Sequence, residues 1–139
     1  MNINEYNYEN ISKGMVFKFE RVLTDLDLAN FASLTGDYNP LHCDVKYAKD
    51  HGFKNKVVYG MLAGSLFSSL LGMICPGRKN LYLSQDLNFK KPIYLDTNLV
   101  VRGEVIDKFD STKVLVIKTQ IISGNDIMVD GLAKVKVIN

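Results

Sequence analysis

The stretch of sequence that decides the fold spans residues 60–73 and consists of GMLAGSLFSSLLGM. Apolar side chains occur on nearly every side of the helix that this stretch predicts, which is typical of a helix that other elements surround. Its small residues recur every four positions and therefore share one side of that helix: Gly60, Gly64, Ser68 and Gly72. Small residues along one side indicate that a sheet, a second helix or a ligand packs very close to it.

The chain after this helix has the pattern of β-strands. Four runs are rich in β-branched residues or alternate apolar with polar residues, and turn signals separate them: 81–89, 98–106, 114–122 and 127–137. Short connections between the last three runs predict an antiparallel meander. A buried helix followed by these strands predicts an α+β fold in which the sheet wraps around the helix.

The chain before this helix contains one predicted strand and two predicted helices. Residues 15–22 alternate apolar and polar side chains over most of their length, which predicts a strand. Residues 24–27, TDLD, resemble a capping box, so a helix is expected to begin at Thr24, and Gly36 is its expected stop. A further short helix is expected over residues 45–50.

Residues 36–42, GDYNPLH, form the first candidate site. Asp37 and His42 carry groups suited to moving protons near neutral pH. Pro40 fixes its own φ and disfavours helical geometry at Asn39, so we expect a rigid loop that presents an acid/base pair. The amide of Asn39 is placed to orient either partner. The structural alternative is an Asp that caps a turn beside a His that fills a loop.

The long helix offers two more candidates. Gly60 opens it, and a free N–H at a helix N-terminus suits a carbonyl oxygen that gains negative charge; the alternative is a glycine that only relieves crowding. Ser68 is either an orienting group or a packing residue bonded to its own backbone. Cys43 adjoins His42, but sequence neighbours usually point different ways, so we do not expect a Cys/His nucleophile.

Two basic pairs, Lys90-Lys91 and Arg78-Lys79, are either solvated surface or contacts for a phosphate-bearing tail. The chain has two histidines and no Cys-x-x-Cys pattern, so we expect no metal site.

Length and composition limit the class of protein. We expect residues 1–139 to form one domain, because the length is typical of one and 47% of the residues are hydrophobic. A net charge of +2, with both signs mixed, argues against a nucleic-acid partner. Two cysteines, a polar N-terminus without a signal-peptide pattern and no apolar run long enough for a membrane predict a cytoplasmic protein.

Three segments resemble one family. Residues 31–42, FASLTGDYNPLH, with Ala48 six positions on, resemble the hydratase motif of the R-specific enoyl-CoA hydratases, in the MaoC-like branch of the hot-dog superfamily. Residues 57–68 are similar to that family's central helix and its lead-in, and residues 89–93, FKKPI, to the segment after it. The resemblance covers nearly the whole chain. It implies a curved antiparallel sheet around a long central helix, in a homodimer whose sheets join edge to edge.

The resemblance also implies an activity in fatty acid metabolism. The expected enzyme is a lyase that adds water reversibly to trans-2-enoyl-CoA and gives (R)-3-hydroxyacyl-CoA. Asp37 and His42 match the dyad that activates the water, and Gly60 matches the N–H that holds the thioester oxygen. Asn39 and Ser68 match supporting residues. No metal or redox cofactor is implied, because the thioester itself acidifies the α-carbon; CoA or phosphopantetheine is part of the substrate.

The chain departs from the family pattern at two places near the expected thioester pocket. Tyr59 stands where the family often has His, and Leu95-Asp96 stands where it often has Gly-Asp. Tyr59 is expected to line the substrate pocket, and Lys90 and Lys91 are expected to contact the tail. The alternatives are the same chemistry on an acyl carrier protein thioester, a hot-dog thioesterase, or a non-catalytic partner, against which the intact dyad argues.

Overall fold

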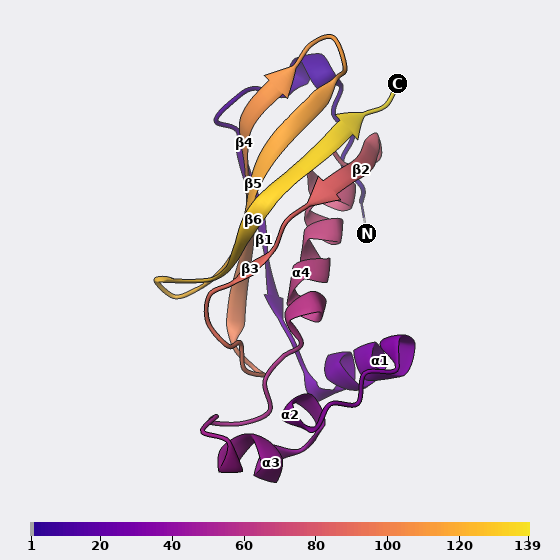
Figure 1. Ribbon diagram of the computed structural model, residues 1–139. Helices are drawn as coiled ribbons and strands as arrows, with labels where there is room; N and C mark the ends of the chain where they lie inside the picture. The colour runs from indigo at the N-terminus through magenta and orange to yellow at the C-terminus, as the bar shows by residue number, and fades with distance from the viewer. Residues whose placement is uncertain (1) are drawn as a thin grey trace.

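The computed structural model describes residues 2–139 and shows a six-stranded antiparallel sheet with one long helix along its face (Figure 1). The strand order is β1-β4-β5-β6-β2, and β3 also pairs with β6. The strands are β1 (Val16–Val22), β2 (Asn80–Gln85), β3 (Asn88–Phe89), β4 (Asn98–Phe109), β5 (Val114–Ser123) and β6 (Asp126–Val137). The predicted antiparallel meander is confirmed as β4, β5 and β6.

Helix α4 (Gly60–Ser69) and the π-helical turn that continues it, Leu70–Ile74, form the central helix. Phe67, Leu70 and Leu71 are fully buried, and burial of each such side chain contributes about 1.5–3 kcal/mol. They share one core with residues of β4, β5 and β6: Val101, Val105, Leu115, Ile117, Ile121, Val129 and Val135. This is the predicted α+β hot-dog arrangement, an antiparallel sheet around a central helix.

One side of α4 is closely covered by β3 and the residue before it. A Cβ atom at Gly64 would lie 2.7 Å from Cδ1 of Leu87, and a Cβ atom at Gly60 would lie 3.0 Å from Cε1 of Phe89. The absence of a side chain at both positions lets this segment approach the helix. The predicted close packing is therefore confirmed for this half of the small-residue stripe.

The other half of the stripe is open. Ser68 is exposed, and within the described chain nothing lies within 4 Å of a Cβ atom built at Gly72. The prediction that α4 is buried on most sides is wrong for its outer side, because apart from Met61 the side chains there are serines, which have little apolar area to bury. The exposed residues of this side are Met61, Ser65, Ser68 and Ser69.

Three further helices lie at the end of the molecule where α4 begins (Figure 1). The first begins with the predicted capping box, because Oγ1 of Thr24 accepts from the N–H of Asp27 and the Asp27 carboxylate accepts from the N–H of Thr24. It ends at Gly36, whose φ of 76° is left-handed. The predictions of strand β1, of this helix and of a helix over residues 45–50 are confirmed. The helices are α1 (Asp25–Thr35), α2 (Pro40–Cys43) and α3 (Val45–Asp50).

The run predicted over residues 81–89 is wrong as a single strand, because it divides into β2 and β3 around Asp86. The N–H of Leu132 donates to Oδ1 of Asp86 at 3.1 Å, so a side chain accepts where a backbone carbonyl normally would. The backbone oxygen of Asp86 lies only 1.9 Å from where a Cβ atom of residue 131 would be, which the glycine there permits. The Asp86 side chain thus takes the place of a backbone acceptor, and this interrupts the strand.

Candidate active site

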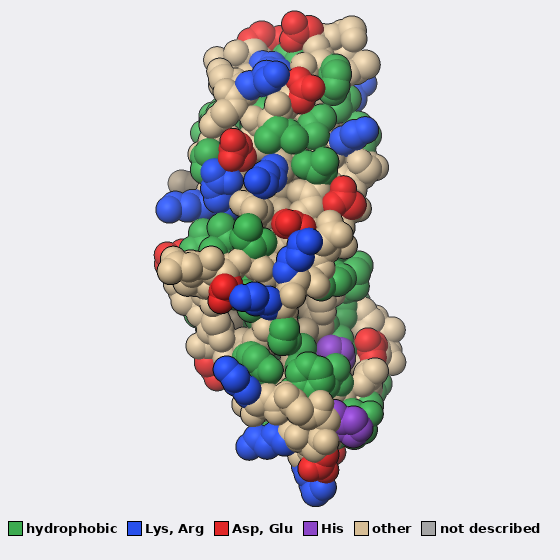
Figure 2. Space-filling model, turned by 60° about the vertical axis from the view of Figure 1, so that its left-hand side comes forward, with side chains coloured by type: hydrophobic (Ala, Val, Ile, Leu, Met, Phe, Trp, Pro, Cys, Tyr) green, Lys and Arg blue, Asp and Glu red, His purple; other side chains and the backbone are tan. Residues whose placement is uncertain are grey.

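Helices α1 and α2 and the start of α4 surround an open cavity of about 550 Å³. The structure brings Asp37, His42 and Gly60 together in its lining. Figure 2 shows the two histidine side chains at this end of the molecule, beside hydrophobic side chains. The remaining lining residues are Phe31, Thr35, Tyr59, Met61 and Ser65.

Asp37 is held by the turn that follows α1. Its N–H donates to Oγ1 of Thr35 at 3.3 Å, and its Oδ1 accepts from the N–H of Asn39 at 3.0 Å. Asn39 therefore supports Asp37 through its backbone, while its side-chain oxygen caps α2 by accepting from the N–H of Leu41. Among residues 2–139, the second carboxylate oxygen of Asp37 has no hydrogen-bond partner, so it is available to a water or a substrate.

His42 lies in the one-turn helix α2. The prediction of a loop is wrong here, because proline is favoured as the first residue of a helix, and Pro40 begins this one with Asn39 as its cap. Nδ1 of His42 lies 2.6 Å from the carbonyl oxygen of Val57. A carbonyl only accepts, so Nδ1 carries a proton, and in the neutral imidazole Nε2 then has the lone pair. The imidazole is thus set up to accept a proton at Nε2.

Tyr59 is only 2% exposed and contacts both acid/base groups. Its hydroxyl donates to the backbone oxygen of Asp37 at 2.6 Å, and its ring centroid lies 4.0 Å from that of His42. Burial raises the pKa of Tyr59 above its ordinary value, so the hydroxyl remains a donor at neutral pH. The residue expected to contact substrate therefore directs its polar group to the protein.

Gly60 is the first residue of α4 and follows Tyr59, whose side chain makes no capping hydrogen bond. The first N–H groups of a helix lack partners within the helix and carry a partial positive charge. Because Gly60 lines the cavity, these groups are placed to stabilise negative charge on an oxygen bound there.

Ser65 rather than Ser68 lines the cavity together with the acid/base pair. Its hydroxyl donates to the carbonyl oxygen of Leu62 at 2.6 Å. The sequence contained a signal for this position, because Ser65 is four residues after Met61, which also lines the cavity, and such residues share one side of a helix.

Residues 8–125 match the family model described as MaoC like domain. The chain belongs to the MaoC-like domain family. The predicted resemblance is therefore confirmed, and the names of the curated relatives place the family among the hydro-lyases.

Two curated relatives and one solved structure are similar to this MaoC-like protein. It is 38% identical over 111 residues to an (R)-specific enoyl-CoA hydratase of Aeromonas caviae, covering 79% of this chain and 83% of the relative. It is 38% identical over 93 residues to a mitochondrial 3-hydroxyacyl-[acyl-carrier-protein] dehydratase of Solanum lycopersicum, covering 67% of this chain and 55% of the relative. The unliganded R-hydratase PhaJ1 of Pseudomonas aeruginosa superposes with a TM-score of 0.93 at 30% identity, covering 99% of this chain and 88% of that one.

The basic pairs of the MaoC-like chain do not line this cavity. Lys91 Nζ lies 2.8 Å from Oδ1 of Asp126, and Lys90 is exposed just beyond β3. The charges of Arg78 and Lys79 are both close to the carboxylate of Glu5, at 3.7 Å and 3.5 Å. Three of the four cations are therefore partly neutralised by neighbouring carboxylates.

The two cysteines of the MaoC-like chain are free thiols. Sγ of Cys43 lies 3.5 Å from the hydroxyl oxygen of Tyr59, so its nearest polar contact is the tyrosine. Burial raises the pKa of the Cys75 thiol to about 12, which keeps it protonated and unreactive at neutral pH.

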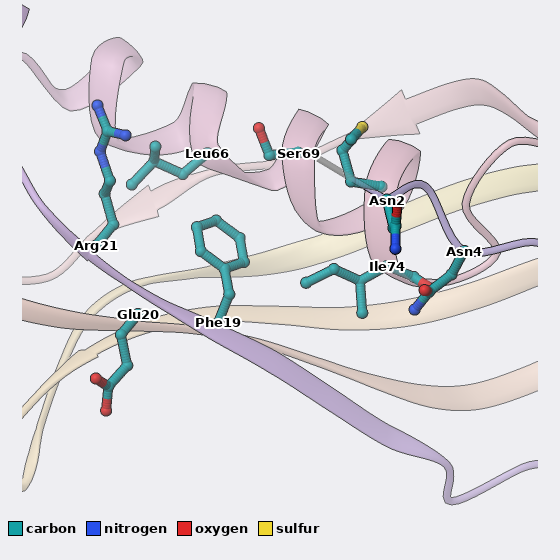
Figure 3. Close-up of a pocket in the computed structure, with 9 residues that line it drawn as sticks. Asn2, Asn4, Phe19, Glu20, Arg21, Leu66, Ser69 and Ile74 are labelled. Atoms are coloured by element: carbon teal, nitrogen blue, oxygen red, sulfur yellow. The ribbon is translucent and has the colours of Figure 1, made fainter.

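A second cavity of about 500 Å³ lies between β1 and the central helix (Figure 3). Phe19 points from the strand toward the helix, where Leu66 and Ser69 lie. Glu20 and Arg21 are the charged residues of its lining, and neither histidine contributes to it. The cavity that holds Asp37 and His42 is therefore the candidate active site.

Proposed function

We propose that this protein is an R-specific 2-enoyl-CoA hydratase, which adds water reversibly to trans-2-enoyl-CoA and gives (R)-3-hydroxyacyl-CoA. The observation that supports this most is the meeting of three complementary groups in one cavity. Asp37 has an unengaged carboxylate oxygen, His42 has an accepting Nε2, and the N-terminus of α4 lies at Gly60.

In the proposed reaction, Asp37 and His42 bind one water between them. The dyad takes a proton from the water as the water oxygen bonds to C3 of the enoyl group, and it delivers a proton to C2. The C2–C3 double bond becomes single, and the transient negative charge resides on the thioester oxygen. The N–H at Gly60 stabilises that charge. Both groups face one side of the substrate, so hydroxyl and proton arrive from the same side.

The proposed chemistry uses no metal or redox cofactor, because the thioester carbonyl itself makes the α-carbon acidic. CoA enters as part of the substrate. The reaction is an equilibrium, so the same dyad serves dehydration of the 3-hydroxyacyl thioester.

We further propose that residues 1–139 form one MaoC-like domain that acts as a cytoplasmic homodimer. Strands β1 and β2 lie at the edges of the sheet, and an unpaired edge favours pairing with another chain. Leu81, Leu83 and Phe89 place exposed apolar side chains on β2 and β3. Sedimentation should give about twice the chain mass of 15.6 kDa. No helix among residues 2–139 is long and apolar enough to cross a membrane.

The proposal is tested by the loss of enoyl-thioester absorbance with a short-chain trans-2-enoyl-CoA, followed by chiral analysis of the product. Asp37→Asn and His42→Ala should each lower the rate by about a hundredfold or more. His51→Ala changes the exposed second histidine and should leave the rate unchanged. Inactivity of the wild type on every enoyl thioester, or near-normal turnover of both dyad variants, contradicts the proposal. A thiol reagent run in parallel detects thioester hydrolysis, the activity of a hot-dog thioesterase.

A second candidate keeps the chemistry and changes the carrier to acyl carrier protein. The similarity to the tomato dehydratase favours it, although the chain spans about half the length of that relative. An acidic carrier needs exposed cations, and Lys91, Arg78 and Lys79 already lie beside carboxylates. Comparing kcat/KM for one acyl group on the two carriers decides between the candidates.

A further inference from the structure

We infer that Tyr59 is a positioning residue that fixes Asp37 and His42 relative to each other. The inference rests on the proposed function and assigns a role to a residue whose hydroxyl donates to the protein backbone. Tyr59 is one of the two places at which the sequence departs from the expected family pattern.

The first contact fixes Asp37. The Tyr59 hydroxyl donates to the backbone oxygen of Asp37 at 2.6 Å, while the N–H of Asn39 holds one carboxylate oxygen of the same residue at 3.0 Å. With backbone and carboxylate both bonded, the remaining carboxylate oxygen has one preferred direction. Tyr59 is 2% exposed whereas Asp37 is exposed, so this bond ties a turn at the surface to a side chain that is fixed in the core.

The second contact fixes His42. The Tyr59 and His42 ring centroids are 4.0 Å apart with 30° between the planes, so the imidazole lies against the phenol face. The carbonyl oxygen of Val57 lies 2.6 Å from Nδ1 and bonds to it. Together the two contacts restrict rotation of the imidazole and therefore set the direction of Nε2.

Tyr59 is itself firmly placed. Its carbonyl accepts from the N–H of Ala63 at 3.0 Å as α4 begins, and its ring lies 4.8 Å from that of Phe31. The segment 57–60 thus contacts every proposed reacting group: Val57 bonds to the histidine, Tyr59 to the aspartate, and Gly60 supplies the N–H. Small misplacements of reacting groups cost large factors in rate, so this segment is where the geometry of the site is set.

The test is Tyr59→Phe, which removes only the hydroxyl. We expect kcat to fall by about tenfold, because one well-placed hydrogen bond is lost, while KM changes by less than about twofold, since the hydroxyl does not touch the substrate. Tyr59→Leu, which also removes the ring, should lower kcat further. The matched control is Tyr8→Phe: that tyrosine is 3% exposed, its hydroxyl donates to Asp110 at 2.8 Å, and it does not line the cavity.

Wild-type kcat in Tyr59→Phe, or equal losses of kcat in Tyr59→Phe and Tyr8→Phe, overturns the inference. A second measurement is independent of activity. The ring protons of His42 should be shifted upfield in the NMR spectrum by the Tyr59 ring and should move downfield in folded Tyr59→Leu, with His51→Ala providing the assignment. Unmoved ring protons also overturn the inference. A wild type that hydrates no enoyl thioester, yet shows this shift, contradicts the proposed function and leaves the contact established.

Discussion

The two sides of helix α4 differ in whether they present buried apolar side chains or exposed polar groups. The inner side packs Phe67 and its neighbours against the sheet, and these side chains are fully buried. The outer side and the N-terminal end carry serines and an open helix start, and they share a cavity with Asp37 from the turn after α1 and His42 from α2. The inner side therefore provides stability, whereas the outer end keeps polar groups available for chemistry. Mutations on the two sides should separate these two functions.

The largest effect should come from the inner side. Phe67→Ala removes a side chain with no exposed area and should lower the free energy of unfolding by about 3–5 kcal/mol, measured by denaturant titration. Because Phe67 does not line the active-site cavity, the kcat of the remaining folded protein should stay within about threefold of wild type. A loss of stability below about 1 kcal/mol would contradict the division between the two sides.

A substitution on the outer side of α4 should change substrate binding rather than stability. Ser65→Leu places a larger side chain in the cavity and should raise KM by about tenfold with little change in the free energy of unfolding. Ser65→Ala is the matched control and should leave kcat and KM nearly unchanged, because the Ser65 hydroxyl bonds to its own helix rather than to the dyad. Initial-rate kinetics on both variants decide whether this side binds the acyl thioester.

The turn before the dyad depends on a backbone conformation. Gly36 has a φ of 76°, and a side chain there should cost about 1–2 kcal/mol although nothing lies within 4 Å of it in the described chain. Gly36→Ala should therefore destabilise the protein by that amount in a denaturant titration. Gly72→Ala has equal space and an ordinary φ, so it should be neutral or slightly stabilising. Equal losses of stability in the two variants would contradict the view that the left-handed conformation at residue 36 requires glycine.

The smallest effect concerns the start of α1. The N–H of Thr24, with a further contribution from Arg21, lowers the pKa of Asp27 below its ordinary value. A lowered pKa contributes stability above the ordinary pKa of Asp, and this contribution disappears as the pH falls through the folded-state pKa. Asp27→Asn should thus be less stable than wild type by about 0.3–1 kcal/mol at neutral pH. The difference should vanish near pH 2 in thermal unfolding; a constant difference would contradict it.

Features encoded by neighbouring residues could be predicted from the sequence. The capping box at Thr24, the stop at Gly36 and the meander of β4 to β6 all depend on residues close in the chain, and the structure contains each of them. Asp37, His42 and Gly60 could be named from a motif and a helix start, and the structure places them in one cavity.

Features that depend on distant residues could not be predicted in the same way. The contact of His42 with Val57 spans 15 positions, and that of Tyr59 with Asp37 spans 22, so no local pattern encodes either. The interruption at Asp86 depends on Leu132, which lies 46 positions away. Ser65 lines the cavity because of how helices α1 and α2 pack near α4. This packing depends on the whole fold and could not be predicted from the residues around Ser65.

The segment 57–60 is fastened on both sides by backbone bonds. The N–H of Val57 donates to the carbonyl oxygen of Leu41 at 3.1 Å, and the N–H of Val58 donates to that of Ile93 at 2.8 Å. These bonds hold the peptide groups of residues 57–60, so their dipoles should keep the same orientation with or without a bound thioester. Water around a charge-forming reaction must first reorient, and that reorganisation is part of the barrier in solution. Because residues 57–60 are already held in one orientation, the proposed reaction would not need this reorganisation.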